Sequence, residues 1–303
     1  MSAVVVLAGG SGGAKLARGM LDVAGSDLVV VANTADDIEL YGAHVSPDPD
    51  LCAFWLADRI DARGWGLDGD TFCVMEGLRE LGVDVWFELG DRDLAIGLER
   101  SRRLGGGERL TEALAALTSA LGVAARVLPM SDDVVRTRVR AEGRWWPFQE
   151  FMIRHGAQGP VEGVAFDGID GAAPPPEVLA ALATARAIVI GPSNPVISVR
   201  PILDVPGLAD ALRASPASVV AVSPVVGGAV VKGPTEAFMA WAGFALDAAG
   251  VGAYYGDLLD GIVTDETADG LSIPALTTDT LMGDLAACSR VARETLDFAL
   301  ALR

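Results

Sequence analysis

Short apolar runs rich in β-branched residues alternate along the chain with longer stretches whose apolar positions recur at helical spacing. The runs predict buried strands at Val4–Leu7, Leu28–Val31, Ala187–Ile190 and Val219–Val222. The stretches between and after them predict helices at Ala14–Val23, Pro176–Thr184, Gly207–Ala214 and Thr235–Ala249. This alternation predicts an α/β, Rossmann-like three-layer fold with a mostly parallel sheet.

Between about Leu51 and Leu121 the pattern changes to one typical of helices. Apolar residues at helical spacing predict helices at Thr71–Leu81, Leu94–Leu104 and Leu110–Leu121. We expect a single α/β domain over residues 1–303 with a helical insertion at about 51–121, although a separate helical domain fits the same pattern. Ala125–Trp145 alternates as antiparallel or edge strands do, and Ala286–Leu300 predicts a closing helix.

Composition and charge narrow the classes of partner. The net charge of −18 opposes binding to nucleic acid or to an anionic membrane. Three cysteines without a CxxC pair indicate neither a disulfide framework nor a zinc site. The N-terminus has no basic leader, and glycines interrupt its apolar run, so we expect a cytoplasmic protein. A small anionic ligand remains compatible with this net charge where arginine, lysine, backbone N–H groups or a bound cation locally reverse the negative field of the protein.

Four glycines follow the first predicted strand, at Gly9, Gly10, Gly12 and Gly13. Backbone N–H groups at the start of a helix form an anion site, so we expect this glycine loop to contact phosphate. The alternative is that the glycines only let strand and helix pack closely.

The loop matches neither familiar nucleotide motif. A Walker motif needs glycine before Lys15 and serine or threonine after it, and the dinucleotide fingerprint needs glycine at Lys15 itself. The acidic residue expected at the end of the second strand of a dinucleotide-binding fold is replaced by Asn33. Lys15 and Lys232 are the only lysines, and both lie near glycines.

An acidic segment, Asn33–Asp50, begins where the second predicted strand ends, and open α/β sheets bind ligands at that edge. It carries five carboxylates and no lysine or arginine. Mg²⁺ takes one or two carboxylates and completes its shell with water and phosphate oxygens. One acid from Asp36 and Asp37 and one from Asp48 and Asp50 would suffice. A solvated loop, with Asp50 capping a helix near Leu51, is the alternative.

Two further loops carry candidate binding residues. Asp91 and Arg92 precede a predicted helix, for which Asp93 could be the N-cap. Ser193 and Asn194 follow the strand at Ala187–Ile190, and Arg200 could bind phosphate; a proline-rich turn without a ligand is the alternative there. Lys232 lies in a glycine-rich loop after the fourth strand. No serine or cysteine has an evident base partner, which leaves diphosphate chemistry by positioning and charge neutralisation.

Taken together, GGSGGAKLARGM, NTADDIELYGAHVSPDPD, GDRDLA and GPSNPVISVRPIL resemble the 2-phospho-L-lactate transferase (CofD/FbiA-type) family of coenzyme F-420 biosynthesis, in the same order. The resemblance implies transfer of a phospholactyl or phosphoenolpyruvyl group from a guanosine diphosphate conjugate to the deazaflavin Fo. GMP would be released. A homodimer is also implied by the resemblance alone.

Carried onto this sequence, the resemblance places Mg²⁺ on acids among Asp36, Asp37, Asp48 and Asp50. From the sequence and the resemblance together, the residues expected to bind substrates are Gly9, Gly10, Gly12, Gly13, Lys15, Asn33, Thr34, Asp91, Arg92, Ser193 and Asn194. Asp37 and Asp50 are expected to be catalytic, with Asp50 as the base that receives the hydroxyl proton. The family often has leucine between its last two acids, where this chain has Pro49.

Two other functions fit parts of the sequence. Non-catalytic proteins of the same fold that bind nucleotide sugars usually continue the paired aspartates with glycine and serine, whereas Ile38–Tyr41 follows here. A nicotinamide-dependent oxidoreductase is opposed by the failed fingerprint and the missing ribose-binding acid.

Overall fold

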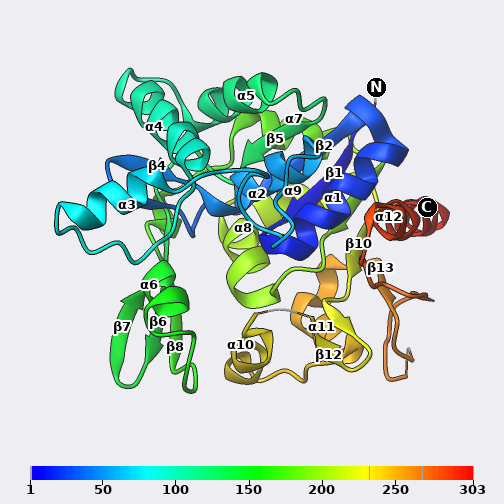
Figure 1. Cartoon of the computed structure of the whole chain (residues 1–303). Coiled ribbons are helices and arrows are strands. Elements are labelled where there is room, and N and C mark those ends of the chain that lie inside the picture. Colours follow the sequence, from blue (N-terminus) through cyan, green and yellow to red (C-terminus); the bar gives the residue numbers. More distant parts are fainter. Residues whose placement is uncertain (1, 232, 268, 303) are drawn as a thin grey trace.

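A seven-stranded sheet forms the centre of the molecule (Figure 1). The structure is a computed structural model that describes residues 2–231, 233–267 and 269–302. The strands lie in the order β14-β13-β10-β9-β1-β2-β5, and every neighbouring pair is parallel. Their bounds are β1 Val4–Ala8, β2 Leu28–Ala32, β5 Arg126–Pro129, β9 Ala187–Ile190, β10 Val219–Val222, β13 Gly261–Thr264 and β14 Ala275–Thr277.

Side chains of each central strand alternate between two cores. On β1, Val5 and Leu7 belong to one cluster of buried residues, and Val4, Val6 and Ala8 belong to the other. Both faces of the strand are fully buried because helices cover the sheet on both sides. The predicted three-layer α/β fold is therefore confirmed.

Different helices cover the two faces. The first face packs against α7 Pro176–Ala183, α8 Arg200–Asp204, α9 Leu208–Arg213, α10 Thr235–Ala242 and α11 Ala248–Tyr255. The second face packs against α1 Gly10–Ala24, α2 Pro47–Leu56 and α12 Leu285–Ala301. The predicted closing helix is α12, and it packs directly on α1: a Cβ atom added to Gly19 would lie 2.1 Å from the carbonyl oxygen of Cys288.

The predicted helical insertion contains three helices, α3 Cys73–Glu80, α4 Asp91–Gly105 and α5 Leu110–Ala120. Met75 of α3 and Leu94 of α4 share a small core with Ala43 and Val45. The last two residues belong to an antiparallel hairpin, β3 Ile38–Leu40 with β4 Ala43–Val45, inside the acidic segment. The insertion thus packs on the segment that carries the candidate acids. That it forms one domain with the rest stays a prediction.

Besides the helical insertion, another group of elements projects from the sheet, on the opposite side of the acidic segment from α4 (Figure 1). We call it the arm; it consists of an antiparallel sheet, β6 Arg136–Ala141, β7 Arg144–Pro147 and β8 Gly163–Asp167, and the short helix α6 Phe148–Ile153. The expected antiparallel or edge strands in Ala125–Trp145 are confirmed, since β5 is an edge strand of the main sheet and β6 and β7 pair antiparallel.

Two predictions of local structure need correction, and several short strands were missed. The first helix begins at Gly10 rather than Ala14, so three of the four glycines lie in its first turn. The helix expected at Thr235–Ala249 is two helices, because Gly243 adopts a φ of 82° and ends α10. The strands β8, β13 and β14 were not predicted, and neither was the small hairpin β11 Val225–Val226 with β12 Ala229–Val230.

Candidate active site

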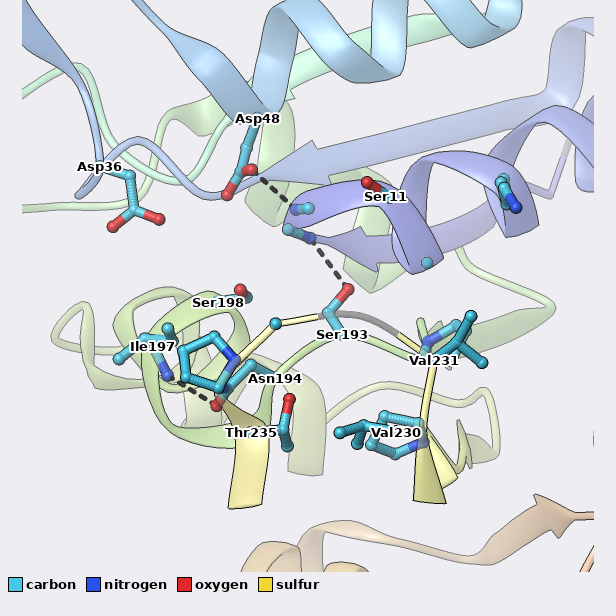
Figure 2. A pocket seen from close by; sticks show the side chains of 18 of the residues that line it. Ser11, Asp36, Asp48, Ser193, Asn194, Ile197, Ser198, Val230, Val231 and Thr235 are labelled. Carbon is cyan, nitrogen blue, oxygen red and sulfur yellow. Dashed lines mark hydrogen bonds between the residues drawn. The ribbon is translucent and has the colours of Figure 1, made fainter. Parts of the chain in front are cut away.

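A cavity of about 400 Å³ opens at the carboxyl ends of β1, β9 and β10 (Figure 2). One side is polar and includes Asp36, Asp48 and Ser193, while Val230 and Val231 line the other side. The size is that of a small-molecule site. The predicted residues that line the cavity are Gly9, Gly10, Gly12, Lys15, Asp36, Asp48, Ser193 and Asn194.

The glycine loop meets two other parts of the cavity wall through its backbone. The N–H of Gly10 donates to Asp48 Oδ1 at 2.7 Å, and the N–H of Gly9 donates to Ser193 Oγ at 3.3 Å. A Cβ atom on Gly12 would lie 2.1 Å from the carbonyl oxygen of Pro192. Close packing is therefore one reason for glycine here, and it leaves the first turn of α1 open to the cavity.

Gly13 lies behind this wall and does not line the cavity. A Cβ atom there would lie 2.9 Å from Cα of Ala8 and 2.8 Å from Ser193 Oγ. Its role is the close approach of α1 to the end of β1.

Asp48 is buried at the start of α2 and bridges two elements. Its Oδ1 accepts from Gly10, and its Oδ2 accepts from Asn33 Nδ2 at 3.0 Å. Burial raises the pKa of Asp48 to about 6, although these two hydrogen bonds oppose the rise. Asn33, at the end of β2, is thus turned towards Asp48.

Asp36 is the acid whose carboxylate is least engaged. Its side chain lines the cavity and is 5% exposed, yet Oδ1 has no hydrogen-bond partner among the described residues. Burial raises the pKa of Asp36 well above its usual value, and the neighbouring charge of Asp48 adds to the rise. Its backbone carbonyl accepts from Gln149 Nε2 of α6 at 2.9 Å, which ties the arm to this position.

Asp37 points away from the cavity into a polar network. His44 Nε2 lies 2.9 Å from Asp37 Oδ2, and Ser46 Oγ donates to Asp37 Oδ1 at 2.8 Å. Thr34 is also buried outside the cavity lining, and its Oγ1 has no partner within the described ranges. The sequence placed Asp37 and Thr34 at the binding site, but neither residue lines the cavity.

Asp50 is held from behind by Arg100 of α4. Both carboxylate oxygens accept from the guanidinium of Arg100, through Nη1 at 3.1 Å and through a shorter contact from Nη2. Burial raises the pKa of Asp50, and Arg100 opposes that rise. Asp50 does not line the cavity, and it is not the N-cap of α2, which begins at Pro47 after Ser46.

Asp91 and Arg92 lie outside the cavity lining. Asp91 accepts from Thr71 Oγ1 at 2.7 Å and from the N–H of Val74 at 2.9 Å, and these contacts lower its pKa. It therefore holds the start of α3. The N-cap position of α4 is Gly90, so Asp93 is not the cap considered from the sequence.

The turn after β9 is built as a helix start. Asn194 Oδ1 accepts from the N–H of Val196 at 2.9 Å and of Ile197 at 3.3 Å, and so begins a π-helical turn at Pro195–Val199. Its Nδ2 has no partner in the described parts of the chain and belongs to a residue that lines the cavity. Arg200 pairs with Asp204 at 3.0 Å and does not line the cavity.

Lys15 supplies a positive charge at the cavity wall. Its Nζ donates to the carbonyl oxygen of Met282 at 2.9 Å and lies 5.6 Å from the centre of the Trp55 ring. Among the described residues it is the one lysine or arginine in the cavity lining. Lys232, the other lysine considered from the sequence, lies outside the described residues.

The fit to a divalent cation can be judged from these contacts. No group of three or more histidine, cysteine, aspartate and glutamate side chains is arranged for a metal within residues 2–231, 233–267 and 269–302. Mg²⁺ needs only one or two carboxylates when a phosphate ligand is present. Asp48 fits this need, because it lines the cavity beside Asp36 and each of its oxygens accepts only one hydrogen bond from the described residues, which leaves lone pairs for a cation. Asp37 and Asp50 are engaged elsewhere.

Sequence reasoning missed Arg100 and Gln149, which hold the acidic segment from the insertion and from the arm. The missing signal is distance along the chain, since each lies 50 residues or more from its partner. Nothing in the neighbouring sequence distinguishes the fully buried Arg100 from the exposed arginines of the same helix.

Curated proteins that are similar to this chain over most of its length are named as transferases. A phosphoenolpyruvate transferase from Kitasatospora aureofaciens is 40% identical over 317 residues, which cover 99% of this chain and 98% of the relative. A 2-phospho-L-lactate transferase from Methanosarcina mazei is 39% identical over 265 residues, 87% of each chain. This class of enzyme sets aside the oxidoreductase considered above.

The family match is equally extensive. Residues 4–275 match the model of the family described as 2-phospho-L-lactate transferase CofD. The chain belongs to this transferase family, as the resemblance implied. A UPF0052-family protein from Bacillus halodurans has the same fold, with a TM-score of 0.65 and 18% identity over 98% of this chain and 99% of its own.

None of the described helices has the length and apolar character needed to cross a lipid bilayer. The cytoplasmic location and the homodimer expected from the sequence stay predictions.

Proposed function

We propose that this enzyme transfers a phospholactyl or phosphoenolpyruvyl group from its guanosine diphosphate conjugate to the ribityl hydroxyl of the deazaflavin Fo. The hydroxyl oxygen forms a bond to the phosphorus that carries the small acid. The bond from that phosphorus to the oxygen of GMP breaks, and GMP leaves with the electron pair. Relatives named for both acids support this range of donors.

The two sides of the cavity suit these two substrates. The first turn of α1, Lys15 and the Ser193–Asn194 turn offer N–H, ammonium and amide donors for a diphosphate. The apolar side, with Val230 and Val231, suits a flat ring system. We therefore assign the donor to the polar side and the deazaflavin ring to the apolar side.

The unpartnered oxygen of Asp36 carries the chemical part of the proposal. Its raised pKa makes this carboxylate a better proton acceptor than an exposed aspartate. We assign to Asp36 Oδ1 the proton of the attacking hydroxyl, in place of Asp50, whose oxygens both face Arg100. Asp48, with the phosphate oxygens, would hold Mg²⁺, which when bound neutralises charge on the diphosphate and on departing GMP.

A mass-resolved turnover assay tests the function. Purified protein is incubated with Fo and, separately, the lactyl and the enolpyruvyl guanosine diphosphate donors, each with Mg²⁺ or with a chelator. We expect GMP and an Fo adduct of matching mass, lost on chelation. If neither donor gives an adduct with folded protein, the transferase proposal fails, and a nucleotide-sugar-binding protein of the same fold becomes the better account.

A further inference from the structure

Arg100 is a charged side chain that is fully buried, and burial of a charge costs desolvation free energy. It is 0% exposed and lies on α4 of the insertion. A buried guanidinium needs partners of opposite charge and hydrogen-bond acceptors. Its partners are the two oxygens of Asp50 and the carbonyl oxygen of His44, at 2.8 Å from Nη1. Every one of these contacts reaches the acidic segment.

The same face of α4 makes a second contact with the backbone of His44. The N–H of His44 donates to Ser101 Oγ at 2.7 Å, next to Arg100 in sequence. One turn earlier, a Cβ atom on Gly97 would lie 3.0 Å from Ala43 Cβ and 3.2 Å from the carbonyl oxygen of His44. Glycine at this position permits the close approach that lets Arg100 reach Asp50.

The geometry of α2 connects these contacts of α4 to the cavity. Asp48 and Asp50 are two residues apart in the first turn of α2, so their side chains point about 200° apart around its axis. Asp48 faces the cavity and Gly10, while Asp50 faces α4. An ion pair on one face of this turn therefore sets the direction of the carboxylate on the other.

We propose that Arg100 is a positioning residue that, through Asp50 and the first turn of α2, holds Asp48 against the N–H of Gly10 at the cavity. It touches no substrate and acts on the reaction only through Asp48. The proposal rests on the proposed function for its kinetic consequence, but its structural part does not.

Hydrogen exchange tests the structural part without turnover. The full-length chain carrying Arg100→Met or Arg100→Lys is compared with the wild type by amide exchange of the peptide containing Gly9–Gly13. We expect exchange at Gly10 about tenfold faster in Arg100→Met, the effect of losing one hydrogen bond, and an intermediate rate in Arg100→Lys. Arg102→Met is the matched control, since Arg102 lies on the same helix, is exposed and forms its ion pair with Glu99 of α4 rather than with the acidic segment.

A second comparison separates positioning from a general loss of structure. In a chain that already carries Asp48→Ala, adding Arg100→Met should leave the exchange of Gly10 unchanged. Unchanged exchange at Gly10 in both folded Arg100 variants, or an equal increase with and without Asp48, would overturn the proposal.

Kinetics supply the functional part. Wherever the wild type shows transfer, we expect Arg100→Met to lower kcat roughly 10- to 100-fold with a smaller change in KM for Fo, and Arg100→Lys to recover part of the loss. A wild type without transfer activity would count against the proposed function and leave the exchange result for Arg100 standing. Unchanged kcat in Arg100→Met would contradict the positioning role.

Discussion

The glycine loop and the acidic segment border the same cavity but are held in place by different means. The glycine loop is held through its backbone, by the hydrogen bonds from Gly9 and Gly10 and by the close packing that Gly12 and Gly13 allow. The acidic segment is fixed by side chains from distant elements, Arg100 on one side and Gln149 on the other. The comparison teaches that the glycine loop depends on close backbone packing, which one methyl group would block, whereas the placement of the charges depends on side chains that lie far away in the sequence.

The largest effect should follow from removing the two carboxylates that face the cavity. We expect Asp36→Ala and Asp48→Ala each to lower kcat by about 10² to 10⁴-fold, because proton transfer and charge neutralisation are lost. Steady-state turnover measures this, with Asp170→Asn as the control, an exposed aspartate that does not line the cavity. Near-wild-type turnover in Asp36→Ala would remove that residue from the mechanism.

A methyl group in the glycine loop should have the next largest effect. In Gly12→Ala the new Cβ atom would collide with the carbonyl oxygen of Pro192, so the loop and the Ser193–Asn194 turn must separate. We expect KM for the donor to rise about tenfold, on the scale of one lost hydrogen bond.

Gly77→Ala is the matched control for that change. Gly77 lies in α3 with nothing within 4 Å of an added Cβ atom, so alanine there should leave KM unchanged and stabilise the helix. Equal KM values for both variants would show that the glycine loop tolerates side chains and is not held by close packing.

A smaller effect concerns stability and runs opposite to activity. Because the pKa of Asp36 is raised in the folded state, the folded protein binds this proton more tightly than the unfolded chain does. Stability is therefore lost as the pH rises from about 4 towards the folded-state pKa. Asp36→Asn removes this loss, so without ligand its Tm at pH 7 should exceed that of the wild type by ~2 to 4 °C.

Thermal unfolding at several pH values checks the sign. The difference in Tm between Asp36→Asn and the wild type should shrink as the pH falls towards 4, where both side chains are neutral. A variant less stable than the wild type at pH 7 would mean that the carboxylate of Asp36 is stabilised by contacts rather than strained by burial.

The smallest effect on activity should come from Asp91, which the sequence placed among the substrate-binding residues. Its carboxylate holds the start of α3 through Thr71 and Val74. We expect Asp91→Asn to lower Tm slightly, because an ionised acceptor at a helix start is lost, and to change turnover less than about twofold. A large rise in KM for either substrate would restore Asp91 to the binding site.

The sheet could be predicted from sequence because burial on both faces leaves a local mark. Val4–Ala8 and Leu28–Ala32 are continuous apolar runs, and such runs occur where helices cover both sides of a parallel strand. The short strands β13 and β14 were missed because Gly261 opens the first and the second is only three residues long.

The site could be predicted as a set of residues but not as a set of roles. The pattern found the acidic segment and the edge of the sheet where it lies. It could not separate Asp36 from Asp37, which are adjacent in sequence, because His44 and Ser46 decide which of them turns inward. Asp48 and Asp50 are separated in the same way by Gly10 and Arg100.

The bond from Lys15 to the carbonyl oxygen of Met282 has a consequence for the order in which the protein is made. The two residues are 267 positions apart. Strand β1 also pairs with a strand made much later, β9, whose Ala187 lies opposite Val4. At ribosomal speeds of about 5–20 residues per second, that strand is synthesised roughly 10 to 40 s after β1. Lys15 is therefore synthesised 267 residues before Met282, so the glycine loop cannot make this contact until the C-terminal part of the fold has followed it.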